Sequence, residues 1–325
     1  MCHVTCVRQL RCTCVIVALY LSLCFVGVCS EGAGNSSKEL PNRFKSFRNS
    51  SLPPSLYQAI RIQYKVISGY DMFHRADVVW HTLGQSVPAG RLVILSEEFN
   101  GKPPFDFPLQ QVMRFPDFIS NGLKYRYSQL KWLHAILGTE PQLPYDWLVL
   151  LDDDTFLIHS ALQQLLAAYS PTELLLVGKI GEPACHILCG GAGFALSRAL
   201  VASLRSELAA TALRRVFTDA IFPETSQSTL HFHSDVLLSH FIKDRRDLLG
   251  HTRLVPRSEF KNFPPVIAMR WFKEGLRDQA VSFHRIASPE LYWELYLTYY
   301  SSNRSHTDMT RRRGRYLEHN RLHRH

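Results

Sequence analysis

The clearest feature of the hydrophobic pattern is an unbroken apolar run that ends in three acidic residues. Residues 147–151 are all apolar, and Asp152, Asp153 and Asp154 follow directly. A continuous apolar run of this length is typical of a strand that is buried on both faces, as in a parallel sheet. The acids are then expected at the carboxyl end of that strand, the edge at which open α/β sheets bind ligands.

Strand and helix patterns alternate on both sides of this run. Short apolar runs predict strands, and apolar residues that recur every three or four positions predict helices. The alternation predicts an α/β fold with a mostly parallel, twisted sheet between helices, in three layers and as a single domain over residues 55–300. The expected further strands cover residues 61–67, 91–95, 174–177 and 280–283, and the expected helices cover 77–83, 123–137, 160–168 and 235–242.

The three acids predict a metal site. Adjacent carboxylates repel one another unless a cation lies among them. A hard divalent ion such as Mn2+ or Mg2+ prefers oxygen ligands and often bridges to phosphate. The alternative is an acidic turn in which Asp154 or Thr155 caps the following helix, but a cap needs one acid and not three.

Three later segments carry groups that fit such a site. The cluster Gly190–Gly193 is expected to run into a helix, so that the backbone can approach a ligand closely. Asp235 opens a helical pattern and is either a carboxylate that accepts a proton or, with Ser234, an ordinary N-cap. His284 follows a short apolar strand, and is either structural or a ligand for an ion such as Mn2+.

The N-terminal segment has the pattern of a targeting sequence. Basic residues precede an apolar stretch at residues 15–30, which we expect to be a type II transmembrane anchor with residues 1–14 in the cytoplasm. A cleaved signal peptide is the alternative, and would give a secreted protein. Either route places the chain in the lumen of the endoplasmic reticulum or Golgi apparatus, behind a polar stem at residues 31–54. Sequons at Asn35, Asn49 and Asn303 agree with this route.

The charge distribution narrows the class of ligand. The net charge is +9, and part of it lies in a basic tail at residues 301–325. Basic character suits anionic ligands such as nucleotide sugars, sulfated glycans or membrane surfaces. The sequence has no zinc-finger spacing, RNA-recognition signature or homeodomain pattern, so we expect no nucleic-acid partner.

Two cysteines lie beyond the N-terminal segment, Cys185 and Cys189. In an oxidising compartment they form a small-loop disulfide, or they remain as two buried thiols. Zinc is a poor fit, because two further ligands at matching spacing are missing.

Four blocks in this order resemble the Fringe-like inverting glycosyltransferases of the GT-A fold, a group that includes Fringe and the core 1 β1,3-galactosyltransferases. The similarity covers about residues 60–286, and an anchor and stem are also typical of Golgi enzymes of this kind. The blocks are residues 147–157, 190–198, 234–238 and 281–284.

The resemblance implies a role for each acidic motif. Asp154 and His284 would bind the metal, and Asp152 and Asp153 would lie near the ribose and the transferred sugar of a UDP-sugar donor. The implied reaction moves a hexose or N-acetylhexosamine to a hydroxyl of a glycan acceptor, with a β1,3 linkage and inversion at the anomeric carbon.

The resemblance also assigns the remaining residues. Asp235 would be the catalytic base, and Gly190, Gly191 and Gly193 would shape the pocket for donor and acceptor. The family often has two acids where this chain has Ser234 and Asp235, so only Asp235 carries over. The few luminal cysteines leave the subfamily, and with it the sugar, open.

Two other functional classes compete with an enzyme. One is an inactive family member that acts as a chaperone or glycan-binding protein, against which the intact acids argue. The other is a protein that binds polyanions or membrane surfaces through residues 310–325. The sequence does not predict the oligomeric state.

Overall fold

The computed structural model describes residues 59–69, 72–98, 107–115, 121–138, 143–181, 188–222, 232–264, 280–286, 288–300 and 313–314. All of them belong to one unit, residues 43–325. The expected anchor, the stem, the three sequons, Cys185 and most of the basic tail lie outside the described residues. Within the described part of the chain, no helix combines the length and the apolar character needed to cross a bilayer.

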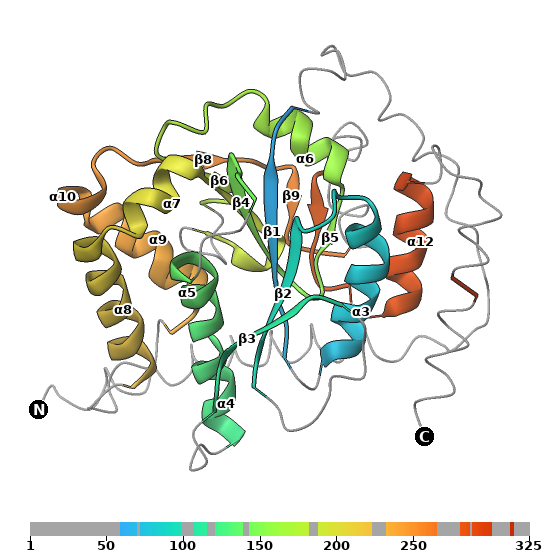
Figure 1. Ribbon diagram of the computed structural model, residues 1–325, viewed down its shortest axis with the longest axis horizontal. Coiled ribbons are helices and arrows are strands. Elements are labelled where there is room, and N and C mark those ends of the chain that lie inside the picture. Colours follow the sequence, from blue (N-terminus) through green and yellow to red (C-terminus); the bar gives the residue numbers. More distant parts are fainter. Residues whose placement is uncertain are drawn as a thin grey trace, which may run out of the picture. The chain divides into compact units, whose positions relative to one another are not determined.

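A seven-stranded sheet lies at the centre of the described residues (Figure 1). Its order is β3-β2-β1-β4-β7-β6-β8, and only the two pairs that involve β7 are antiparallel. The predicted α/β class with a mostly parallel sheet is therefore confirmed. The strands are β1 Ile62–Ile67, β2 Leu92–Glu97, β3 Leu109–Met113, β4 Trp147–Asp152, β6 Leu175–Gly178, β7 Phe194–Ser197 and β8 Arg253–Pro256.

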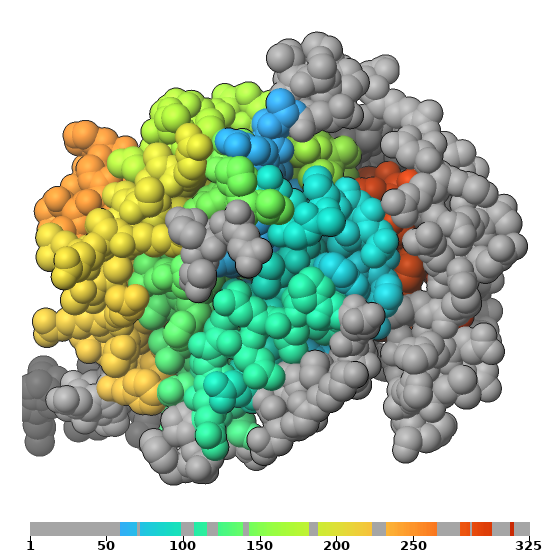
Figure 2. Space-filling model, viewed as in Figure 1, coloured from blue at the N-terminus to red at the C-terminus, as the bar shows by residue number. Residues whose placement is uncertain are grey.

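Helices cover both faces of this sheet, which gives three layers (Figure 1). In the view of Figure 2, the α8 region (dark yellow) lies at the left of the molecule and the α3 region (cyan) lies at the right. One core lies beneath α3 Phe73–Thr82, α6 His159–Leu166 and α12 Pro289–Tyr300. The other lies beneath α5 Leu130–Leu137, α7 Arg198–Leu204, α8 Glu207–Ile221, α9 Ser234–Asp244 and α10 Arg246–Leu249.

The side chains of β4 explain its unbroken apolar sequence. Successive side chains of a strand point to opposite faces of the sheet. Trp147, Val149 and Leu151 accordingly belong to the first core, and Leu148 and Leu150 belong to the second. Because each face meets a layer of helices, no position of the strand is available for a polar residue until the strand reaches its acidic end.

A second, three-stranded sheet connects distant parts of the chain. It has the order β5-β10-β9, with β5 Phe156–Leu157, β10 Ser282–Phe283 and β9 Phe260–Lys261. Phe156 pairs with Phe283 in the antiparallel register of β5 and β10. This pairing brings the segment after the three acids beside the segment that leads into His284.

One local prediction was wrong, and one alternative is excluded. The glycine cluster forms a short 3-10 turn, η4 Gly190–Ala192, and leads into the strand β7 rather than into a helix. The three acids are followed by β5, and the N-cap of α6 is Ile158, so neither Asp154 nor Thr155 caps a helix.

Other elements also differ from expectation. The single helix expected at residues 123–137 is two helices, α4 Asn121–Ser128 and α5, separated at Gln129. The helix expected to begin at residue 77 begins at Phe73. The edge strand β3 was not predicted, because its half-exposed sequence has too few apolar residues for a clear pattern.

The buried position of β4 gives a first prediction. Leu150 is fully buried, so Leu150→Ala leaves a cavity and should lower the free energy of unfolding by about 2–5 kcal/mol. Leu208→Ala on α8 is the matched control, since Leu208 is 66% exposed and its truncation should change stability by about 0.5 kcal/mol or less. Urea denaturation of the purified protein measures both, and equal effects would contradict this placement of β4.

Candidate active site

The three acids lie where the strand order reverses direction. From β1 the chain proceeds to β2 and β3 on one side, whereas β4 adds to the other side of β1. Open α/β sheets bind ligands in the crevice at such a switch point, outside the carboxyl ends of the strands. Asp152 pairs with Ile67 at the end of β1, and the Asp153 N–H donates to the Ile67 carbonyl over 3.1 Å. The acids therefore lie at the ligand-binding edge of the sheet.

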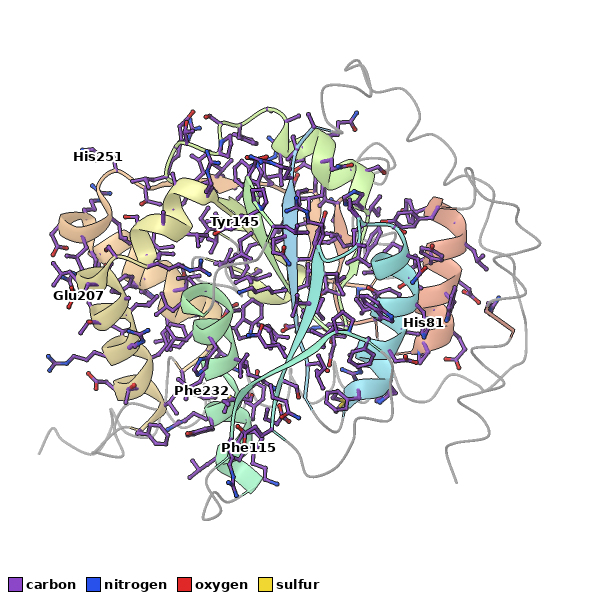
Figure 3. The ribbon with its side chains drawn as sticks, viewed as in Figure 1. His81, Phe115, Tyr145, Glu207, Phe232 and His251 are labelled. Atoms are coloured by element: carbon purple, nitrogen blue, oxygen red, sulfur yellow. The ribbon has the colours of Figure 1, made fainter. Side chains whose placement is uncertain are left out.

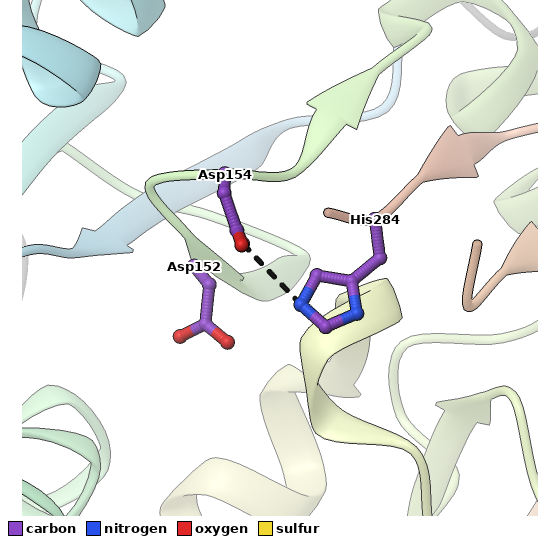
Figure 4. A group of neighbouring side chains, drawn as sticks. All are labelled: Asp152, Asp154 and His284. Carbon is purple, nitrogen blue, oxygen red and sulfur yellow. Dashed lines mark ion pairs between the residues drawn. The ribbon is translucent and has the colours of Figure 1, made fainter. Parts of the chain in front are cut away.

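Asp152, Asp154 and His284 form a group that could hold a metal ion (Figure 4). One ligand atom from each lies within 4.8 Å of the other two. Asp154 Oδ1 lies 3.3 Å from His284 Nε2. The structure thus brings together the two residues expected to bind the metal, and it adds Asp152, which was expected to lie nearer the sugar donor.

The lone pairs at this point fit a cation. His284 Nδ1 lies 2.9 Å from Asn262 Oδ1, and an amide oxygen can only accept, so we assign the proton to Nδ1. The Nε2 lone pair then faces Asp154 Oδ1, a buried atom for which the described residues provide no hydrogen-bond donor. A carboxylate oxygen and an imidazole nitrogen thus face each other with lone pairs that can both coordinate an ion such as Mn2+.

Asp153 points elsewhere. Its Oδ2 accepts a hydrogen bond of 2.7 Å from the Ser68 hydroxyl, and its Oδ1 lies 3.8 Å from Arg75 Nη1. Burial raises the pKa of Asp153 to about 7, against the opposing effect of the Ser68 hydrogen bond. Asp153 is thus linked to the end of β1 and to α3, and it does not belong to the metal group.

The site carries an excess of negative charge. Burial first, and then the charges of Asp154, Asp153 and Asp235, raise the pKa of Asp152 well above its usual value. Lys131 opposes this shift, but its ammonium group is already 2.7 Å from the Glu97 carboxylate. A bound cation would relieve this repulsion.

Asp235 lies in the first turn of α9 with both carboxylate oxygens oriented. Oδ2 accepts from the Gly190 N–H over 2.7 Å, and Oδ1 accepts from the Val236 N–H over 2.9 Å. The N-cap residue of α9 is His233, which excludes the alternative that Ser234 or Asp235 is an ordinary N-cap. Ser234 instead donates through its N–H and hydroxyl to the side-chain oxygen of Gln129.

The glycine cluster allows close approach to these side chains. A Cβ at Gly190 would lie 2.5 Å from the Asp235 Cβ, and a Cβ at Gly191 would overlap the His284 ring. Gly193 has φ of 79°, and a Cβ there would lie 2.6 Å from Leu151 Cδ2. The expectation of close backbone approach is met, but the groups approached are the side chains of the site itself.

Cys189 adjoins this turn directly. It is buried and disulfide-bonded, so the alternative of two buried thiols was wrong. The disulfide fixes the chain immediately before Gly190.

A cleft of about 850 Å³ opens in front of these groups. Beside the predicted residues, it is lined by side chains that the sequence reasoning missed. Asn262 orients His284, and Arg75 and Lys131 bring positive charge to the acids. Each is a single polar residue without a local pattern, so no sequence signal identified it. The missed residues are Ser68, Arg75, Glu97, Tyr125, Gln129, Lys131 and Asn262.

The sequence of this part of the chain matches a known protein family. Residues 124–248 match the family model described as Fringe-like, which supports a glycosyltransferase. This part of the chain is therefore similar to the Fringe-like family. It contains the acids at the end of β4, the glycine cluster and Asp235, and it ends before His284. The predicted resemblance is confirmed over this range.

Solved structures similar to the chain are also glycosyltransferases by description. Apo GlyE of Streptococcus pneumoniae TIGR4 is 11% identical with a TM-score of 0.45, over 77% of this chain and 62% of GlyE. A glycosyltransferase involved in glycosylation of the major capsid of PBCV-1 is 10% identical with a TM-score of 0.41, over 71% of this chain and 98% of that one. An active-site mutant of LgtC is 10% identical with a TM-score of 0.43, over 70% of this chain and 88% of LgtC. The chain thus spans about three fifths of the length of GlyE.

Substitutions at the two consecutive glycines should have different effects on metal binding. Gly191→Ala should displace the His284 ring and lower Mn2+ affinity by about 10- to 100-fold, as for the loss of a group that orients a metal ligand. Gly190→Ala displaces Asp235 instead, so Mn2+ affinity should change much less. Isothermal titration calorimetry measures both, with melting temperatures to check folding. Equal losses in the two variants would indicate general distortion of the turn and would contradict the specific contact with His284.

Proposed function

We propose that the protein is a divalent-cation-dependent inverting glycosyltransferase. It moves a hexose or N-acetylhexosamine from a UDP-sugar to a hydroxyl of a glycan acceptor, with a β1,3 linkage. The observation that carries the proposal is that Asp154 meets His284, and that His284 and Asp235 adjoin the same turn, in a cleft at the switch point of the sheet. The Fringe-like match over residues 124–248 supports it.

The residues divide into two groups with different tasks. Asp154 and His284, with Asp152 beside them, would hold Mn2+ or Mg2+, and Asn262 orients His284 for this task. The ion would supply positive charge that offsets the charge developing on the diphosphate as it leaves.

Asp235 serves the acceptor in this proposal. Its carboxylate accepts the proton of the acceptor hydroxyl as that oxygen bonds to the anomeric carbon, while the bond from this carbon to the diphosphate breaks. Gly190 holds the carboxylate through its N–H, so the base is oriented before the acceptor arrives. A single displacement of this kind inverts the anomeric centre.

The proposed cellular setting follows from the N-terminal sequence. Residues 15–30 would anchor the chain in the Golgi or endoplasmic reticulum membrane, with the cleft in the lumen. Nucleotide-sugar donor and glycan acceptor would meet there.

Metal dependence is the first test of this function. We expect UDP release and transfer from a UDP-sugar to require Mn2+ or Mg2+ and to stop in excess chelator. Asp154→Ala and His284→Ala should each lower the transfer rate by about 100-fold or more, because the charge stabilisation supplied by a metal amounts to several kcal/mol. Arg215→Ala, at an exposed position on α8, is the control. Full transfer in chelator would refute the metal role.

The role of Asp235 is tested separately. Asp235→Asn retains size and one acceptor oxygen but removes the basic carboxylate, so transfer should fall by about 100- to 10,000-fold while Mn2+ binding persists. A purely structural Asp235 predicts the reverse pattern, with normal turnover and a loss of about 1 kcal/mol in Asp235→Ala, because the hydrogen bonds from the Gly190 and Val236 N–H groups are lost. Transfer rates and melting temperatures of both variants decide the matter, and near wild-type transfer by Asp235→Asn would exclude the base.

A further inference from the structure

An exposed aromatic cluster lies at the mouth of the cleft, on the side of Asp235. The Tyr125 side chain on α4 is 58% exposed. Its ring packs in a T-shaped arrangement with the rings of Phe232 and His233, with centroids 6.0 and 6.1 Å away. Phe232 and His233 stack on each other at 4.6 Å, and the Arg126 guanidinium lies 4.6 Å from the Phe232 ring centre. Figure 3 labels Phe232 near α4.

The cluster is connected directly to the proposed base. His233 is the N-cap residue of α9, two positions before Asp235. Tyr125 and His233 both line the cleft. Partial burial, and after it the charges of Asp152 and Asp235, raise the pKa of Tyr125, which agrees with a phenol that faces the acids. The ring is thus a wall of the cleft near the atom that would accept the proton.

The remaining part of the cleft has a different character. At the ends of β1 and β2, the Lys131 ammonium bonds to the Ser68 carbonyl and the Glu97 carboxylate, and both side chains of the ion pair are at most 8% exposed. This inner end is polar and enclosed and lies beside Asp153, which suits the donor. The open aromatic mouth lies beside Asp235, which suits the other substrate.

Aromatic rings and hexoses have complementary surfaces. A pyranose ring has one face of C–H groups, which packs on the face of an aromatic ring while its hydroxyls remain free for hydrogen bonds. A tyrosine provides such a contact area with little loss of side-chain freedom, because it has only two rotatable bonds. Phe232 and His233 contact the Tyr125 ring, and more than half of the residue remains exposed for a further contact.

We propose that Tyr125, supported by Phe232 and His233, is the acceptor subsite and stacks on the ring of a neutral hexose whose hydroxyl faces Asp235. The inference rests on the proposed glycosyltransferase function, and it adds the chemical class of the acceptor and the residue that positions it. Tyr125 acts by contact with the acceptor sugar and takes no part in breaking the bond to the donor.

The test compares three variants of the full chain on α4. With Mn2+, each UDP-sugar is assayed for UDP release without acceptor and for transfer to a panel of methyl hexosides. Tyr125→Ala should raise the acceptor KM about tenfold, the size expected for one lost ring contact, with unchanged donor KM and UDP release. Tyr125→Phe should behave as wild type. Leu123→Ala is the control, since Leu123 is exposed on the same helix and does not line the cleft.

Several outcomes would overturn the inference. The acceptor KM could be unchanged in Tyr125→Ala. The donor KM could rise instead, which would indicate that Tyr125 stacks on the nucleobase. The wild-type protein could also release UDP without transfer to any methyl hexoside. If the wild-type protein releases no UDP from any donor, the proposed function fails. Saturation-transfer NMR with the same methyl hexosides then decides the subsite alone: signals lost in Tyr125→Ala and retained in Tyr125→Phe support it, and their absence or persistence refutes it.

Discussion

The candidate site depends on one close approach, that of the turn Gly190–Gly191 to two side chains from distant elements. Gly190 contacts Asp235 on α9, and Gly191 contacts His284 after β10. The turn is held in place from the sheet side, where Thr155 donates to the Gly191 carbonyl and Ser282 donates to the Ala192 carbonyl. Because the two glycines are consecutive, they fix the separation between the proposed proton acceptor and the proposed metal ligand. A side chain at either position would separate groups that act together in the proposed reaction.

The folded sheet supplies the free energy that keeps the acids together. Burial of β4 on both faces places Asp152 to Asp154 at the sheet edge, whatever their mutual repulsion. The raised pKa values of Asp152 and Asp153 result first from their loss of water and then from that repulsion. A site in this state gains more from binding a cation than a well-solvated carboxylate would. Burial and mutual repulsion of the carboxylates thus destabilise the site without a cation and favour the binding of a divalent ion.

The sequence predicted those parts of the molecule that leave a local pattern. A strand buried on both faces must be apolar throughout, so residues 147–151, and the acids at the end of this strand, could be placed in the fold. The meeting of Asp154 with His284 could be expected only from the family resemblance, because β5 and β10 are two residues long and have no periodicity. Asn262 and Arg75 are isolated polar residues, and their roles arise only from the tertiary contacts of the fold.

The hydrogen bonds at the start of α9 orient the Asp235 carboxylate but occupy only part of its lone pairs. A carboxylate offers about four lone-pair positions on its two oxygens. The N–H groups of Gly190 and Val236 take one on each oxygen, so each oxygen can still accept a proton. Farther along α9, Leu238, Phe241 and Ile242 pack into the core and prevent the helix from moving. The proposed base is therefore oriented by backbone donors and anchored by apolar packing, and its remaining lone pairs can accept from a substrate hydroxyl.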